Sequence, residues 1–129
     1  MPTAIPENRI DGIYVTEDEK FILEITTSDP YQATFAGTFR SVDSPLGDIT
    51  YSITKCEYHF VGSNYYPCQI GFSVNRRQEP QWDYDQCDYW CGCRTSNGDL
   101  LMSGSRAYIT REGDYKVDSF PMVKFKQIK

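Results

Sequence analysis

The chain has 129 residues, of which 40% are hydrophobic and 24% charged, so it has the size of one domain with one buried core. Its formal net charge is -5 and Arg76-Arg77 is the only basic doublet, which argues against a nucleic-acid partner. No run of about 18 apolar residues is present, so we expect no membrane partner. Residues 1–10 hold two prolines and no apolar stretch, which favours an extended lead-in over a signal peptide and leaves the compartment open.

Strand patterns follow one another along the whole chain, and no segment shows the apolar spacing of a helix. Polar, glycine or proline turns separate eight predicted strands, near residues 12–16, 20–26, 31–41, 48–60, 66–77, 85–94, 99–111 and 115–127. The strongest hairpin signal is Asn97-Gly98, ahead of the seventh strand. Eight consecutive strands with short turns predict an all-β, antiparallel up-and-down barrel, because closure removes exposed strand edges. A barrel of this size holds its own side chains or one small ligand.

The sequence lacks the common catalytic and phosphate-binding motifs. It has no glycine-rich phosphate loop, no H-E-x-x-H and no G-x-S-x-G. The single histidine, His59, excludes a multi-histidine metal site and would have to serve any Ser-His-Asp relay alone. We therefore predict no catalytic residue, no metal and no cofactor.

The cysteine count is odd, so at least one thiol is unpaired within the chain. The five are Cys56, Cys68, Cys87, Cys91 and Cys93. Zinc is disfavoured, because Cys91-Gly-Cys93 has no second, well-separated cysteine pair and His59 is remote in sequence. We expect buried strand thiols or a cross-strand disulfide instead.

Several short motifs occur in an order that is similar to one known family. The seventh and eighth strands carry Leu100-Leu-Met-Ser-Gly-Ser105, Asp118-Ser-Phe120 and Lys124-Phe-Lys126. Upstream stand Gly12-Ile-Tyr14, Gly37-Thr-Phe-Arg-Ser41, Ile70-Gly-Phe-Ser-Val74 and Trp90-Cys-Gly92. Together these segments, over residues 12–126, resemble the avidin and streptavidin family. The resemblance implies an eight-stranded barrel, often a tetramer, that binds biotin in one mouth.

Carried onto this sequence, the resemblance implies a ligand site at ten positions: Thr16, Phe39, Ser41, Asn75, Asp88, Trp90, Asp99, Leu101, Ser103 and Asp118. Several of these positions depart from the family. Thr16 stands for an asparagine and Asp88 for a threonine, Phe39 replaces a hydrogen-bonding tyrosine, and Asn75 and Asp99 replace wall tryptophans. Each lost tryptophan removes on the order of 200 Å² of contact. At roughly 25 cal/mol per Å², two losses cost several kcal/mol of binding free energy, so tight biotin binding is not expected. The carboxylates favour a more polar, neutral or cationic ligand.

Alternation along the strands suggests which side chains face the pocket. Without the family, alternation also supports interior rows of Gly71, Ser73 and Asn75; Gln86, Asp88 and Trp90; and Asp99, Leu101, Ser103 and Ser105. The opposite rows then form an apolar outer wall of Ile70, Phe72, Val74, Leu100, Met102 and Tyr108. Such a wall is too large to stay wet, which predicts a homodimer or homotetramer with the strand-five and strand-six cysteines near the interface, and with Cys68 opposite Cys93 or its neighbour. In the other interpretation, the apolar row packs in the core and the polar row faces solvent.

Three functions compete at this point. The first is a protein that binds a small-molecule ligand in an avidin-like pocket. The second is a small barrel enzyme of the cyclase or isomerase type, using Asp88, Asp99 or a tyrosine as acid or base. The third is a carbohydrate-binding module, suggested by aromatic residues near the strand ends: Tyr65, Tyr66, Trp82, Tyr84 and Tyr89.

Overall fold

The computed structural model describes residues 9–44, 47–61, 64–76, 84–95, 97–110 and 112–129. Its eight strands are β1 (Gly12–Thr16), β2 (Phe21–Asp29), β3 (Thr34–Ser44), β4 (Gly47–Val61), β5 (Asn64–Arg76), β6 (Tyr84–Arg94), β7 (Leu100–Thr110) and β8 (Tyr115–Gln127). Within these ranges we find no helix of the length and hydropathy that a membrane span requires.

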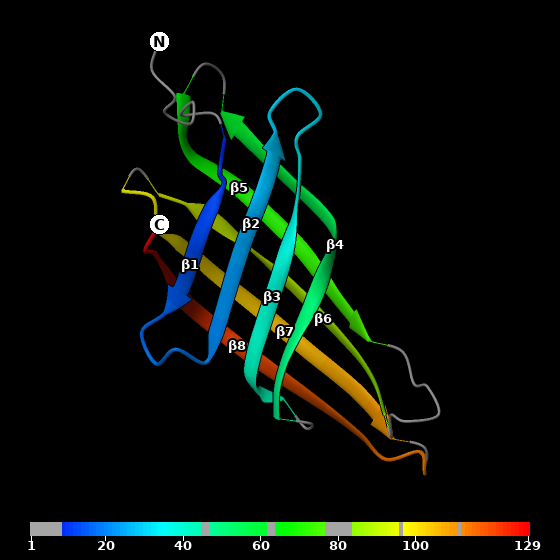
Figure 1. Cartoon of the computed structure of the whole chain (residues 1–129). Helices are drawn as coiled ribbons and strands as arrows, with labels where there is room; N and C mark the ends of the chain where they lie inside the picture. The colour runs from blue at the N-terminus through cyan, green and yellow to red at the C-terminus, as the bar shows by residue number, and fades with distance from the viewer. Residues whose placement is uncertain (1–8, 45–46, 62–63, 77–83, 96, 111) are drawn as a thin grey trace.

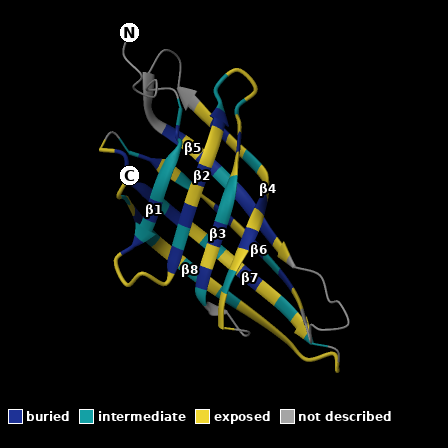
Figure 2. Cartoon of the chain, viewed as in Figure 1, coloured by how far each residue is buried: buried dark blue, intermediate teal, exposed yellow. Residues whose placement is uncertain are grey.

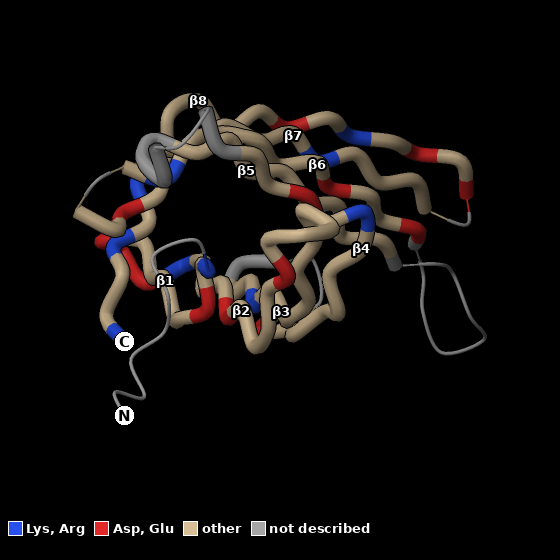
Figure 3. Tube along the Cα trace, turned by 90° about the horizontal axis from the view of Figure 1, so that it is seen from above, with Lys and Arg blue, Asp and Glu red and all other residues tan. Residues whose placement is uncertain are grey.

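The strands form one closed antiparallel barrel in the order of the sequence, which confirms the predicted fold. β8 returns to β1, where Tyr14 lies opposite Gln127 and Thr16 opposite Phe125. In Figure 1, β1 to β4 cross in front of β5 to β8, and Figure 3 shows the ring from above. The third strand begins at Thr34 rather than near residue 31, because Asp29 Oδ1 accepts hydrogen bonds from the backbone N–H groups of Tyr31 and Gln32 and so extends the turn.

The barrel interior is packed with aromatic side chains. Along the strands, buried positions alternate with exposed ones (Figure 2). Trp90 lies at the centre of this cluster. Ring centroids surround it at 5.2 Å for Phe120, 5.3 Å for Phe21, 5.6 Å for Phe39 and 5.7 Å for Phe125. The middle of the barrel is therefore a packed aromatic core. The expected wet interior is absent from this described part of the barrel.

The predicted rows of β5 and β7 are wrong by one residue. A two-residue Asn97-Gly98 turn would place Leu101 and Ser103 on the face of Trp90. Instead, the Thr95 N–H bonds the Asp99 carbonyl at 2.8 Å, with Gly98 at a φ of +92°, so three residues connect the pair. Trp90 then lies opposite Gly104 on β7 and opposite Phe72 on β5. A slip of one residue exchanges every inward and outward side chain of a strand.

The predicted apolar outer wall consequently does not exist. Its members on β5 and β7 point inward and lie within the barrel: Ile70, Phe72, Val74, Leu100 and Met102 are buried and Tyr108 is half-buried. This leaves the prediction of a homodimer or homotetramer without its structural basis. Cys68 also points inward, although it lies opposite Arg94, the neighbour of Cys93, as predicted.

Charged residues of both signs are spread around the ring of strands, as Figure 3 shows.

All five cysteines are free thiols, with Cys91 and Cys93 exposed and Cys56 and Cys87 half-buried. Burial raises the pKa of the Cys56 thiol to about 11 and also raises that of Cys68.

Candidate ligand site at the Arg106 end

The two ends of the barrel differ in the polar groups that they bury. We name the end that carries the β1–β2 turn and the start of β8 the Arg106 end, and the end that carries the β6–β7 turn the Arg94 end (bottom and top in Figure 1). Each has an arginine buried inside the barrel, with relative exposures of 4% for Arg106 and 6% for Arg94. The surroundings of these two side chains decide which end can hold a ligand.

Arg106 and Asp88 form an ion pair that is buried inside the barrel. They lie directly opposite each other on β7 and β6. Arg106 Nε donates to Asp88 Oδ1 at 2.9 Å and Nη2 donates to Oδ2 at 2.8 Å, the bidentate geometry of a strong charge-assisted pair. The side chains are 4% and 0% exposed. Removing two charges from water costs several kcal/mol per ion, so such a pair needs further hydrogen bonds around it.

Those additional bonds come from β3, β4 and β6. Arg106 Nη2 donates to Ser41 Oγ at 3.3 Å, and Gln86 Nε2 donates to Asp88 Oδ1 at 3.2 Å. Tyr51 Oη donates to Gln86 Oε1 at 3.2 Å and extends the network to β4. Both carboxylate oxygens of Asp88 therefore accept hydrogen bonds, so this group is held as an ion-pair partner and is poorly placed to act as a general base.

Two aromatic rings flank the guanidinium group of Arg106. Its Cζ lies 5.5 Å from the ring centroid of Phe120 and 5.9 Å from that of Phe21, within the range of cation–π contacts. The same two rings contact Trp90 in the core. The aromatic core thus extends toward the Arg106 end and surrounds the ion pair there.

A pocket of about 360 Å³ opens beside this arginine. Phe21, Phe120 and Val123 supply its apolar lining, and Asp18, Lys20, Arg106 and Asp118 supply its charges. Asp118 is directly opposite Arg106 on β8, and its carboxylate lies 3.7 Å from Lys116 Nζ. An apolar lining with a few convergent polar groups is typical of small-molecule sites.

The β1–β2 turn fixes one carboxylate at the rim of this pocket. Thr16 Oγ1 donates to Asp18 Oδ1 at 2.8 Å, and the backbone N–H of Lys20 donates to the same oxygen at 3.1 Å. Thr16 Oγ1 also accepts from the Phe21 N–H at 3.1 Å. The hydroxyl of Thr16, and then the Lys20 N–H, lower the pKa of Asp18, so this group is anionic at neutral pH.

At the Arg94 end, a hydroxyl and an amide oxygen accept hydrogen bonds from the arginine, and the Asp99 carboxylate is also buried at this end. Arg94 Nε donates to Tyr14 Oη at 3.2 Å and Nη2 donates to Gln127 Oε1 at 3.1 Å. Tyr14 Oη in turn donates to the carbonyl of Ile10 at 2.7 Å, and Ile10 is fully buried. The segment that precedes β1 thus packs over the interior at this end.

The structure divides the ten predicted site residues. Six face the interior or the Arg106 end: Thr16, Phe39, Ser41, Asp88, Trp90 and Asp118. Asn75 and Ser103 are exposed on the outer face and Leu101 is half-buried there. Asp99 is buried at the Arg94 end, where it accepts from the backbone N–H of Gln127 at 3.2 Å. The predicted convergence of Asn75 and Ser103 on the pocket is wrong, and Asp88 and Asp99 do not share a site.

Sequence reasoning missed Arg106, Phe21 and Phe120. A signal for Arg106 exists in the hairpin of β6 and β7, where the observed register places it opposite Asp88. Opposite charges at directly paired positions stabilise a sheet, but a register one residue away separates them. The two phenylalanines carry no signal that distinguishes them from other core residues.

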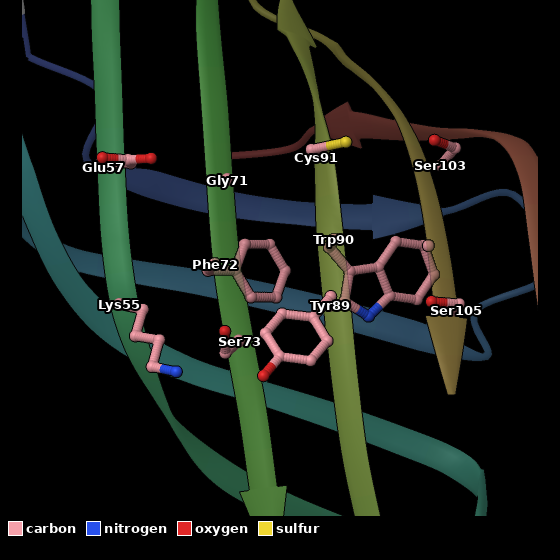
Figure 4. Close-up of a pocket in the computed structure, with 11 residues that line it drawn as sticks. Lys55, Glu57, Gly71, Phe72, Ser73, Tyr89, Trp90, Cys91, Ser103 and Ser105 are labelled. Carbon is pink, nitrogen blue, oxygen red and sulfur yellow. The ribbon is translucent and has the colours of Figure 1, made fainter. Parts of the chain in front are cut away.

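A second hollow, of about 510 Å³, lies on the outer face of β4 to β7 (Figure 4). Small residues form its floor, and Lys55 reaches from β4 toward Tyr89, with Nζ 5.8 Å from that ring centroid. Tyr89 is the only member of the predicted carbohydrate-binding aromatic set whose side chain the structure describes. Trp82 and the side chains of Tyr65, Tyr66 and Tyr84 lie outside the described part.

In the part of the chain that the structure describes, no group of three or more histidine, cysteine, aspartate or glutamate side chains could hold a metal ion. The facing of β5 and β7 differs from the interior rows that the avidin resemblance implied. Comparison with protein-family models, with curated proteins and with solved structures finds no match for this chain.

Proposed function

We propose that this protein binds a small, polar, neutral or cationic molecule in the pocket at the Arg106 end. The observation that carries the proposal is the bidentate Arg106–Asp88 pair, which is buried beneath a pocket of about 360 Å³. Hydrophobic residues of similar volume can often replace a buried ion pair without loss of stability. Its presence beside an open pocket therefore supports a role in recognition as well as in packing.

The charges of the pocket support the ligand class. Asp88 neutralises Arg106, which leaves Asp18, Asp118 and Lys20 as the remaining charged groups of the lining. Lys116 lies close to Asp118 but is itself mostly exposed. Two carboxylates against one ammonium disfavour an anionic ligand such as biotin and favour hydrogen-bond donors or a cation.

The packed core supports a binding site at the mouth over one deep in the barrel. The rings of Phe21, Phe39, Phe72, Phe120 and Phe125 surround Trp90 where a deeply bound ligand would have to lie. A ligand at the Arg106 end would contact Phe21 and Phe120 with one face and the carboxylates with its edge.

An ancestral relation to the avidin family is a separate hypothesis, which the sequence motifs support.

The test is a thermal-shift screen of small neutral and cationic polar compounds, with biotin as an anionic comparison. We expect stabilisation by a subset of the first group and no nanomolar binding of biotin. The decisive variant is the double substitution Arg106→Met with Asp88→Leu, which removes the pair without leaving a buried charge. The exposed pair Arg40 and Asp48 has the same bidentate geometry, at 2.8 and 2.5 Å, so Arg40→Gln with Asp48→Asn is the matched control.

Stabilising compounds should lose their effect on the Arg106/Asp88 double variant and keep it on the control. Binding can be followed by the fluorescence of Trp90 in a Trp82→Phe background, which leaves one tryptophan beside the pocket rings. A screen without any stabilising compound, or compounds that stabilise the double variant as much as the wild type, would count against the proposal.

A further inference from the structure

β6 presents two thiols to solvent on the outer face of the barrel. Cys91 and Cys93 are exposed, and they are separated by Gly92 on a strand whose side chains alternate. Gly71 and Ser103 flank Cys91 on the neighbouring strands, so small residues leave its thiol accessible (Figure 4). Both thiols line one hollow of about 310 Å³. This surface lies outside the barrel and takes no part in the pocket at the Arg106 end.

The spacing of the two thiols suits a bridging ion better than a disulfide. Two residues of extended strand separate their Cα atoms by about 6.7 Å. A disulfide needs sulfur atoms about 2.05 Å apart and Cα atoms that approach each other, usually to about 5.5–6 Å. An ion bound between two thiolates, with bonds of about 2.3 Å, needs the sulfurs only about 4.6 Å apart. Side-chain rotation can close that gap without breaking the ladder to β5 and β7.

The other thiols are less suited to such a site. Cys68 is 1% exposed inside the barrel, and burial raises the pKa values of Cys56 and Cys68, which keeps both thiols protonated. Cys87 faces outward on the same strand but is four residues from Cys91, about 13 Å along an extended strand. Cys91 and Cys93 are therefore the two thiols that can act on one ion.

The ligand chemistry points to a soft ion of low coordination number. Glu57 and His59 line the same hollow from β4, but they contact each other at 3.7 Å across an exposed surface. No set of three such ligands could hold a metal within the described ranges, and structural zinc requires four. Thiolates alone select soft ions such as Cu(I).

We propose that Cys91 and Cys93 form a surface dithiol site that binds one Cu(I) ion. Each thiol loses its proton to solvent as its sulfur bonds to the ion, so one Cu(I) and two thiols give one bis-thiolate complex and two protons. No electron is transferred in this step. The site does not depend on the proposed pocket and can succeed or fail without it.

The test is an anaerobic titration of the reduced, full-length chain with Cu(I) in competition with a chromogenic Cu(I) chelator. We expect one ion per chain. Because even outer-shell partners of a metal are worth about 10- to 100-fold in affinity, Cys91→Ser and Cys93→Ser should each weaken binding by about 100-fold or more. Cys87→Ser, on the same strand, is the matched control and should leave the affinity unchanged.

Phenylarsine oxide supplies an independent measure of geometry, because it condenses with two neighbouring thiols and releases one water. Intact-mass analysis should show one phenylarsine per chain on the wild type and on Cys87→Ser, and none on the other two variants. Thermal unfolding of all three variants checks that the fold is unchanged. Failure of the wild type to take Cu(I) from the chelator, or retention of the ion by Cys91→Ser or Cys93→Ser, would overturn the proposal.

Discussion

The two ends of the barrel bury the same kind of residue in different ways. At the Arg106 end, both carboxylate oxygens of Asp88 accept hydrogen bonds from the Arg106 guanidinium, and Arg106 also lines an open pocket. At the Arg94 end, the Tyr14 hydroxyl and the Gln127 amide oxygen accept from the arginine, and fully buried Ile10 lies over the interior. A buried charge pair is costly to break and specific in geometry, whereas the uncharged acceptors of Arg94 mainly satisfy the donors of a buried guanidinium. The comparison therefore separates the end at which we propose ligand binding from the end at which Ile10 covers the interior.

The largest expected effect is at the Arg106 end. Arg106→Met leaves the Asp88 carboxylate buried without its partner, so the free energy of unfolding should fall by about 3–5 kcal/mol. The double variant with Asp88→Leu removes both charges and should recover most of that loss. Urea denaturation of the two variants and the wild type measures the difference. A double variant as unstable as the single one would show that the ion pair is not the cause.

The Arg94 end should respond less. Arg94→Met leaves the acceptors Tyr14 Oη and Gln127 Oε1 without this donor, which should lower the free energy of unfolding by about 1–3 kcal/mol. The same urea experiment applies. A loss as large as that of Arg106→Met would remove the energetic distinction between the two ends.

A substitution between the two ends tests the aromatic core. A Cβ at position 104 would lie 2.6 Å from the Trp90 ring, so Gly104→Ala should displace the indole and cost about 1–3 kcal/mol of unfolding free energy. Trp90 fluorescence in the Trp82→Phe background should shift as the ring moves. Unchanged fluorescence and stability would contradict the close contact between β7 and the indole.

The smallest effect is expected at the exposed pair on β3 and β4. The hydrogen bond from Arg40 lowers the pKa of Asp48, and the same bond raises the pKa of Arg40. Both side chains are nevertheless 46% exposed. Solvent and salt screen such pairs, so Arg40→Gln should leave the urea midpoint within repeat error. A clear loss of stability would mean that geometry, rather than burial, sets the value of these ion pairs.

Local sequence patterns were sufficient to predict the strands and their order. Turn residues and alternation located all eight strands, and the bounds of the first and the last, Gly12–Thr16 and Tyr115–Gln127, agree with prediction. The facing of β5 and β7 was predicted wrongly, because the resemblance placed polar residues inside. Simple alternation would have placed Ile70, Phe72 and Leu100 in the core, where they lie.

For β6, by contrast, the resemblance predicted the inward-facing residues correctly. Its inward row of Gln86, Asp88 and Trp90 is polar at two positions, and the resemblance predicted it where hydrophobicity alone would not. The polar members are satisfied by Tyr51 on β4 and Arg106 on β7, partners that no single strand pattern reveals. Of the pocket lining, Asp118 was predicted, but Arg106 was missed, because it lies opposite Asp88 only in the register set by a three-residue connection.

The most direct test of the account is an amide-shift map by NMR, using ¹⁵N-labelled protein and the most stabilising compound of the thermal-shift screen. The account predicts the largest shifts at Lys20, Phe21, Arg106 and Asp118, which line the pocket, and unchanged shifts at Tyr14 and Arg94. Largest shifts at Tyr14 and Arg94, or on the outer face at Ser73 and Tyr89, would contradict a ligand site at the Arg106 end.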